Sequence, residues 1–293
     1  MEDKSLGSRI FNFVNILIML LVIFVTAYPM YFVLIASVSD PASLLMHKGA
    51  LFTPLTPMTT AAYELVLKNP MILTGYLNTI FILVFGVAIN LVLTIMGAYF
   101  LVCKGVMFRN LIMFLIVFTM YFSGGMIPTY LNVQSFGLLD SRWALIIPGA
   151  ISTTNLIIMR TAFAGIPDTL VESAKLDGAS HFRIMCQIMI PLSIPTIAVM
   201  VLYYGVGHWN SWFNASIYLR DRKLFPLQLV LREILIANQT NEMMAGADLG
   251  EMAQITELIK YALIVIATAP ILVLYPFLQK HFVKGVMIGA IKG

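Results

Sequence analysis

The chain has 293 residues, of which 60% are hydrophobic and 11% charged, and its mean hydropathy is +0.90. Soluble domains carry roughly 25% charged residues, so this much apolar surface cannot be hidden in a water-soluble core. The net charge of +4 comes from basic residues scattered between apolar blocks, a pattern that indicates membrane topology rather than a nucleic-acid partner.

Six apolar segments are each long enough to cross a bilayer. A helical span needs about 20 mostly apolar residues for the roughly 30 Å hydrocarbon core, and a helix satisfies its backbone hydrogen bonds internally. The first segment is too long for a signal-peptide core and should stay in the protein as an anchor. The predicted fold is all-α, a polytopic membrane protein with one transmembrane domain over residues 1–293. The predicted spans are residues 10–36, 74–102, 110–132, 143–165, 184–209 and 258–280.

The distribution of Lys and Arg predicts that both termini are cytoplasmic. With that orientation the shorter outside loops hold only Lys48, Lys68 and Arg142. Even if the five basic residues in or beside the long loop between spans 5 and 6 are counted outside, the inside keeps the excess. The inside segments hold Lys4, Arg9, Lys104, Arg109, Arg160, Lys175, Arg183, Lys280, Lys284 and Lys292.

The two cysteines predict neither a disulfide framework nor a zinc site. Cys103 and Cys186 form no CxxC motif and have no His cluster beside them. The predicted orientation puts both near the reducing cytoplasmic face, where thiols stay free. We expect no metal site and no catalytic residue in this chain.

The inside loop between spans 4 and 5, at about residues 166–191, contains start and stop signals of a short helix. Pro167 suits the first turn and Asp168 puts a negative charge near the helix N-terminus. Gly178 can supply the left-handed residue that ends the helix after two to three turns. Glu172 and Lys175 are three apart and can pair. An ordinary connection between two spans would need the same cap, glycine and charges, so these signals alone leave that simpler interpretation open.

The particular residues of this loop follow a longer pattern, in which E-A-A is followed after three residues by G and after nine more by I-x-L-P. Ser173 replaces the first Ala of the pattern, and Ile190 replaces its Leu. The loop closely resembles the signature loop of permease subunits of binding-protein-dependent ABC importers. The resemblance implies the ABC importer permease fold and a coupling helix that contacts a partner ATPase. The matching residues are Glu172, Ser173, Ala174, Asp177, Gly178, Ala179, Ile188 and Pro191.

Three further stretches extend the resemblance over nearly the whole chain, at residues 28–41, 207–214 and 275–293. It is greatest to carbohydrate and oligosaccharide importers, the group containing the second maltose permease. The resemblance implies a bacterial cytoplasmic membrane, a second permease, a pair of ATPase subunits and an extracytoplasmic substrate-binding protein, besides membrane lipid. The chain contains no Gly-Lys dipeptide, so the usual phosphate-binding loop is missing. ATP and Mg are therefore expected in the partner ATPase, with no cofactor in this chain.

The outer end of span 5 predicts a substrate pathway. Tyr204, His208 and Trp212 recur at four-residue spacing and would share a face if the helix continues that far. Trp209 and Ser211 lie beside them, and aromatic faces suit sugar rings. Alternatively, the two tryptophans and Tyr204 form the aromatic belt at the outer membrane interface.

Three asparagines lie inside predicted spans, namely Asn78, Asn90 and Asn155. They could line a pathway, although interhelical hydrogen bonds are the more ordinary use of such side chains.

Two other functions stay open at this point. One is an ABC importer permease for a peptide or another solute. The other is a stand-alone channel or secondary transporter, but proton-coupled transporters commonly need an intramembrane charge. No span has an Asp, Glu, Lys or Arg well away from its ends. In each case the chain is a transport protein and not an enzyme.

Overall fold

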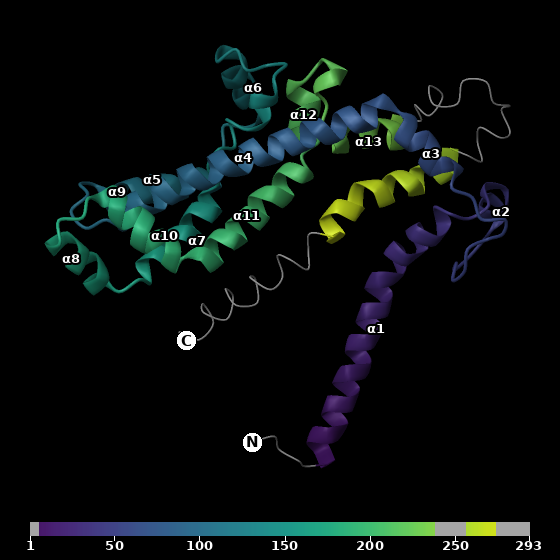
Figure 1. Cartoon of the computed structure of the whole chain (residues 1–293), viewed down its shortest axis with the longest axis horizontal. Helices are drawn as coiled ribbons and strands as arrows, with labels where there is room; N and C mark the ends of the chain where they lie inside the picture. The colour runs from purple at the N-terminus through teal and green to yellow at the C-terminus, as the bar shows by residue number, and fades with distance from the viewer. Residues whose placement is uncertain (1–5, 238–255, 274–293) are drawn as a thin grey trace. The chain divides into compact units, whose positions relative to one another are not determined.

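The computed structural model describes residues 6–237 and 256–273 (Figure 1). Every regular element within these residues is a helix, which confirms the predicted all-α fold. The described residues fall into two compact units, one with the residues up to Pro70 and Glu233–Pro270, the other with Met71–Arg232 and the residues from Ile271. The single domain predicted over the whole chain stays a prediction.

The first unit begins with α1, a 31-residue helix whose side chains before Tyr28 are almost all exposed and apolar. An apolar surface of this size marks a membrane-contacting face. The following loop is tied to α1, since the Tyr28 hydroxyl accepts a hydrogen bond from Leu51 N over 2.9 Å and the Tyr31 hydroxyl donates one to Phe52 O over 2.8 Å. The helices of this unit are α1 (Leu6–Ala36), α2 (Pro41–Met46), α3 (Ala61–Lys68) and most of Thr256–Val273.

The second unit is organised around α4, a 33-residue helix about 50 Å long at 1.5 Å per residue. Its buried side chains recur every three or four residues along one face, which includes Asn78, Asn90 and Thr94. The apolar side chains on its other faces, such as Leu77 and Val84, are exposed. The elements from here on are α4 (Pro70–Val102), α5 (Arg109–Tyr121), α6 (Met126–Ser135), the 3-10 helix η1 (Arg142–Leu145), α7 (Thr153–Ala164), α8 (Asp168–Leu176), α9 (His181–Ile184), the π-helical η2 (Met185–Met189), α10 (Ile190–Leu192), α11 (Ile194–Trp209), α12 (Phe213–Tyr218), the 3-10 helix η3 (Arg222–Leu224) and α13 (Leu227–Ala237).

Among the described residues three helices are long and apolar enough to cross a membrane, namely Gly7–Ala36, Pro70–Val102 and Thr256–Val273. They correspond to predicted spans 1, 2 and 6, although residues 274–280 of span 6 lie outside the described residues. Two bent helix pairs raise the number to five if each pair is one span. The predicted count of six stays a prediction.

Three of the predicted spans are not single helices. In span 3, α5 and α6 meet at an angle of 116°, and in span 5 the helices before and after Ser193 meet at 84°. Span 4 contains the short η1 and only the 12 residues of α7. The sequence predicts each of these spans as continuous because mean hydropathy over a long window does not show a short break in a helix.

Glycine and proline explain where the breaks fall. Gly125 begins α6 with a φ of 89°, a conformation that glycine adopts without strain. Pro191 and Pro195 flank the bend in span 5, and a π-helical turn precedes it at Met185–Met189. Proline removes a helix hydrogen bond and clashes with the preceding turn, and a π turn is a further known cause of a kink.

Candidate functional site

The short helix predicted in the loop between spans 4 and 5 is confirmed as α8, with Pro167 at its N-cap. Gly178 ends it with a φ of +78°. Two hydrogen bonds close the turn at this glycine, one from Gly178 N to Lys175 O over 3.0 Å and one from Ala179 N to Ala174 O over 2.9 Å. A left-handed glycine with such paired bonds is a common helix C-terminus. No residue of α8 is fully buried and most of its side chains are exposed, whereas Val171 and Ala174 are half-buried against the apolar core.

The acidic residues of α8 pair with a lysine from another loop. Lys104 Nζ lies 2.9 Å from Asp168 Oδ2 and 3.3 Å from Glu172 Oε1. Asp168 and Glu172 are one turn apart, so both face the same way. The hydrogen bond to Asp168, and then that to Glu172, raises the pKa of the Lys104 ammonium. The structure thus gives Glu172 a partner other than the predicted Lys175, and nothing local to α8 in the sequence indicated it.

A second contact joins the segment after Gly178 to α4. The Tyr99 hydroxyl lies 2.9 Å from His181 Nδ1, and the two rings meet edge to face with centroids 6.0 Å apart. Cys103 Sγ lies 3.9 Å from the same His181 nitrogen. Cys103 and Cys186 are both free cysteines, as predicted.

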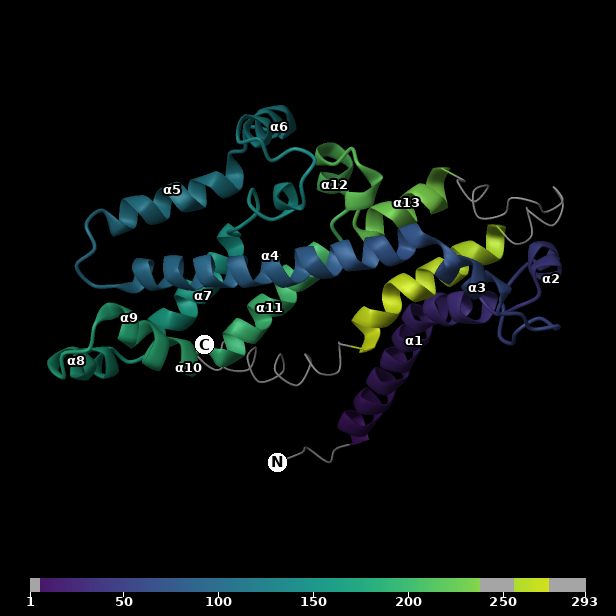
Figure 2. The ribbon, with the colours of Figure 1, turned by 45° about the horizontal axis from the view of Figure 1, so that its top comes forward.

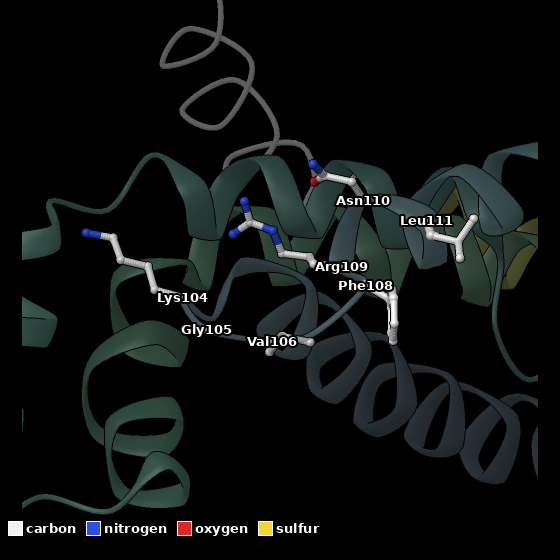
Figure 3. Close-up of a pocket in the computed structure, with 7 residues that line it drawn as sticks. All are labelled: Lys104, Gly105, Val106, Phe108, Arg109, Asn110 and Leu111. Atoms are coloured by element: carbon white, nitrogen blue, oxygen red, sulfur yellow. The ribbon is translucent and has the colours of Figure 1, made fainter.

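The turn between α4 and α5 carries a basic surface depression of about 600 Å³. Figure 3 shows Lys104 and Arg109 among the seven residues that line it, all from the turn itself and the start of α5. Gly105 and Phe108 bend this turn with φ values of 87° and 59°. The described residues contain no group of three or more His, Cys, Asp or Glu side chains that could hold a metal ion.

A cavity of about 890 Å³ lies in the second unit, along α11. Its volume is within the range of small-molecule binding sites. Four of the five residues predicted for the substrate pathway line it, namely Tyr204, His208, Trp209 and Ser211. Asn155 also lines it, together with polar side chains that no sequence pattern indicated, among them Ser152 and Asn214.

The prediction that Trp212 shares the face of Tyr204 and His208 is wrong. α11 ends at Trp209, so the four-residue spacing no longer holds by position 212. The Trp212 ring instead lies 3.7 Å below the guanidinium carbon of Arg232, a cation–π contact. Trp212 is also not among the residues that line the cavity.

Hydrogen bonds between α4 and α11 hold the cavity wall in place. The Tyr204 hydroxyl lies 2.7 Å from Thr94 Oγ1 and accepts a hydrogen bond from Ser152 N over 3.0 Å. One turn away on each helix, His208 Nε2 lies 2.7 Å from Asn90 Oδ1. Figure 1 and Figure 2 both show α11 running beside α4. The pairing of 94 with 204 and of 90 with 208 makes the two helices antiparallel.

Two of the three asparagines bridge segments by hydrogen bonds. Asn90 Nδ2 donates to Gly149 O over 3.1 Å and to Ala150 O over 2.8 Å. Asn78 Nδ2 donates to the carbonyl oxygens of Lys223 and Phe225 over 2.7 and 3.0 Å. Asn155 lines the cavity, so it is the one that faces a possible pathway.

The chain is similar to known permeases over its full length, although no family model matches it. Protein LplC of Bacillus subtilis is 44% identical over 296 residues, covering 100% of this chain and 98% of that protein. The polygalacturonan/rhamnogalacturonan transport system permease protein YtcP of Bacillus subtilis is 39% identical, covering 98% and 99%. A chain in the crystal structure of a bacterial ABC transporter that imports the acidic polysaccharide alginate superposes with a TM-score of 0.88 at 33% identity, covering 96% and 100%. This multi-pass membrane protein therefore belongs to the family of permease subunits of carbohydrate ABC importers.

Proposed function

We propose that this chain lines part of the translocation path of a bacterial carbohydrate importer, together with a second permease. In this assembly a pair of ATPase subunits binds ATP and Mg on the cytoplasmic side, and a substrate-binding protein delivers cargo outside. The observation that carries the proposal is α8, a largely exposed helix that ends at the left-handed Gly178 and whose residues match the coupling loop of the family.

The surface of α8 and its surroundings suits a protein partner. Leu176 is 90% exposed and Phe182 72% exposed, and both flank the turn at Gly178. Large exposed apolar side chains with charged neighbours are typical of interaction sites. The residues proposed to contact the ATPase are Glu172, Ser173, Ala174, Asp177, Gly178 and Ala179.

The cargo we propose is an oligosaccharide. The cavity combines the aromatic side chains of Tyr204 and Trp209 with polar ones such as Ser211 and Asn155, a composition that suits hydroxyl-bearing rings. Two relatives, a polygalacturonan/rhamnogalacturonan permease and a chain of an alginate importer, support acidic saccharides as the first candidates. A peptide or another solute is the alternative that uptake assays must test.

Function is tested with the complete complex in proteoliposomes that contain the co-purified ATPase and binding protein. We expect ATP-dependent uptake of a labelled oligosaccharide, and at least a tenfold loss in the double variant Glu172→Ala, Gly178→Asp. Glu64→Ala, which changes an exposed acidic residue of α3, is the control. Unchanged uptake in the double variant would contradict the role of α8, and transport by the chain without any ATPase would contradict the importer.

The proposed orientation, with both termini cytoplasmic, is tested separately by thiol labelling. In a variant with Cys103→Ser and Cys186→Ser, a single cysteine is placed at Lys175 or at Lys48. A membrane-impermeant maleimide added to intact cells should label position 48 and not position 175. The reverse pattern would invert the topology.

A further inference from the structure

Two independent contacts join the C-terminal end of α4 to α8 and α9. Lys104, two residues after α4, contacts Asp168 and Glu172 on α8. Tyr99, inside the last turn of α4, contacts His181 at the start of α9. Figure 1 and Figure 2 both show α8 and α9 at the end of α4 that leads into α5. The segment around Gly178 is therefore attached to α4 on both of its sides.

The same helix carries part of the cavity wall. α4 has no proline after Pro70 and runs unbroken to Val102, so its two ends move together. Thr94 and Asn90, about three and four turns before Lys104, hold Tyr204 and His208 beside the cavity. A displacement of α8 that moves Lys104 would therefore also shift the cavity wall, because α4 connects the two as one rigid helix.

We infer that Lys104 is a positioning residue for transport, because it ties α8 to α4 so that movement of α8 changes the cavity wall. The inference rests on the proposed function, in which a partner ATPase moves α8. The Lys104 side chain and both carboxylates are more than 60% exposed. Exposed ion pairs contribute little to stability, so loss of this pair should leave the folded complex intact and act on coupling.

The first experiment measures sugar imported per ATP hydrolysed by the reconstituted complex. Lys104→Glu places a third carboxylate beside Asp168 and Glu172, and should lower this ratio at least fivefold with normal assembly and thermal stability. Adding Asp168→Lys restores one opposite-charge pair and should recover part of the ratio. Such a rescue would assign the loss to the pair of opposite charges, and unchanged assembly and thermal stability of Lys104→Glu distinguish coupling from a purely structural role.

The matched control is Arg109→Glu, the same change in charge at the first residue of α5, which lines the same depression (Figure 3). No ion pair or hydrogen bond joins the Arg109 side chain to another described residue. In Arg109→Glu the ratio of sugar imported to ATP hydrolysed should stay within twofold of that of the unmodified complex. An equal loss in both variants would show that the lower ratio comes from the net charge of this region and not from the ion pairs of Lys104, and it would overturn the inference.

A second experiment tests the contact without depending on transport. A carbodiimide joins a lysine amine to a carboxylate that it already touches, and mass spectrometry should find Lys104 linked to Asp168 or Glu172 in the native complex. No link, or a ratio in Lys104→Glu equal to that of the unmodified complex, would overturn the inference. If the unmodified complex imports no saccharide, the proposed function fails, whereas the cross-link result is unaffected.

Discussion

His208 on α11 donates a hydrogen bond from Nε2 to Oδ1 of Asn90 on α4 over 2.7 Å. The direction follows from Asn90, whose Nδ2 already donates to two backbone carbonyl oxygens, so that its Oδ1 is left to accept. The imidazole lies directly on the helix surface at Gly86, where an added Cβ would be 2.5 Å from Nε2 and 2.8 Å from Cε1. Only a residue without a side chain allows this approach.

Gly86→Ala should therefore displace the His208 ring and break its hydrogen bond to the buried Asn90. Leaving a buried polar group unpaired costs roughly 1–3 kcal/mol, and we expect a decrease of that order in the free energy of unfolding. Thermal unfolding of the detergent-purified protein, followed by size-exclusion chromatography, measures it. Gly205→Ala on α11 is the control, because a Cβ there has nothing within 4 Å. Equal stability of the two variants would contradict the close approach.

Tyr204→Phe should destabilise the contact between α4, α11 and the start of α7. The change removes the hydroxyl that bonds Thr94 and accepts from Ser152 N, with almost no change in volume. We expect a loss of roughly 1–2 kcal/mol, visible as a lower unfolding temperature. The neighbouring Tyr203, which is 46% exposed, supplies the control Tyr203→Phe, expected to be neutral. A neutral Tyr204→Phe would show that these two bonds do not stabilise the fold.

The effect of a substitution at Gly178 on ATPase binding should depend on how readily the new residue adopts a positive φ. At +78° alanine is disfavoured by about 1 kcal/mol, asparagine by less and a β-branched valine by more. Retention of the ATPase on purification should thus fall from Gly to Asn, Ala and Val. Gly165→Ala, at the end of α7 with a φ of −79°, should have little effect. A series ordered by side-chain volume alone would argue against the conformational explanation.

Asp140 should make stability depend on pH in the acid range. Its Oδ1 accepts hydrogen bonds from Asp221 N and Arg220 N, each over 2.9 Å, and these bonds hold the pKa of the carboxyl below its usual range. A lowered folded-state pKa means that this stability is present above the unfolded value of about 3.9 and is lost as the pH falls through the folded-state pKa.

The measurement for Asp140 is the unfolding temperature between pH 7 and pH 3. Asp140→Asn keeps a residue type that tolerates the φ of 56° but cannot become charged, so its unfolding temperature should fall less on acidification. Asp177→Asn makes the same change at an exposed residue of the loop after α8 and should leave the acid response as it is in the unmodified protein. Parallel curves for the unmodified protein and Asp140→Asn would rule out this carboxyl as a source of acid sensitivity.

The local features of the fold were predictable because each is encoded within a few residues. About 20 apolar residues in a row form a membrane helix regardless of their neighbours, which explains the agreement at α1, α4 and Thr256–Val273. The helix signals around Pro167 and Gly178 depend only on backbone conformation, and the structure has both at those positions. The residues that match the signature loop likewise indicated the family without any tertiary information.

Other features were decided only by the tertiary structure, because they join residues that are distant in the sequence. Hydropathy could not show that α11 ends at Trp209, which removes Trp212 from the face of Tyr204. No local pattern identified Lys104 as the partner of Asp168 and Glu172, or Asn90 as that of His208. In the sequence of a membrane helix, the apolar face that packs on another helix cannot be distinguished from the apolar face that contacts lipid. Which face meets another helix depends on where small and polar side chains match across the interface, and that match exists only once the helices are packed.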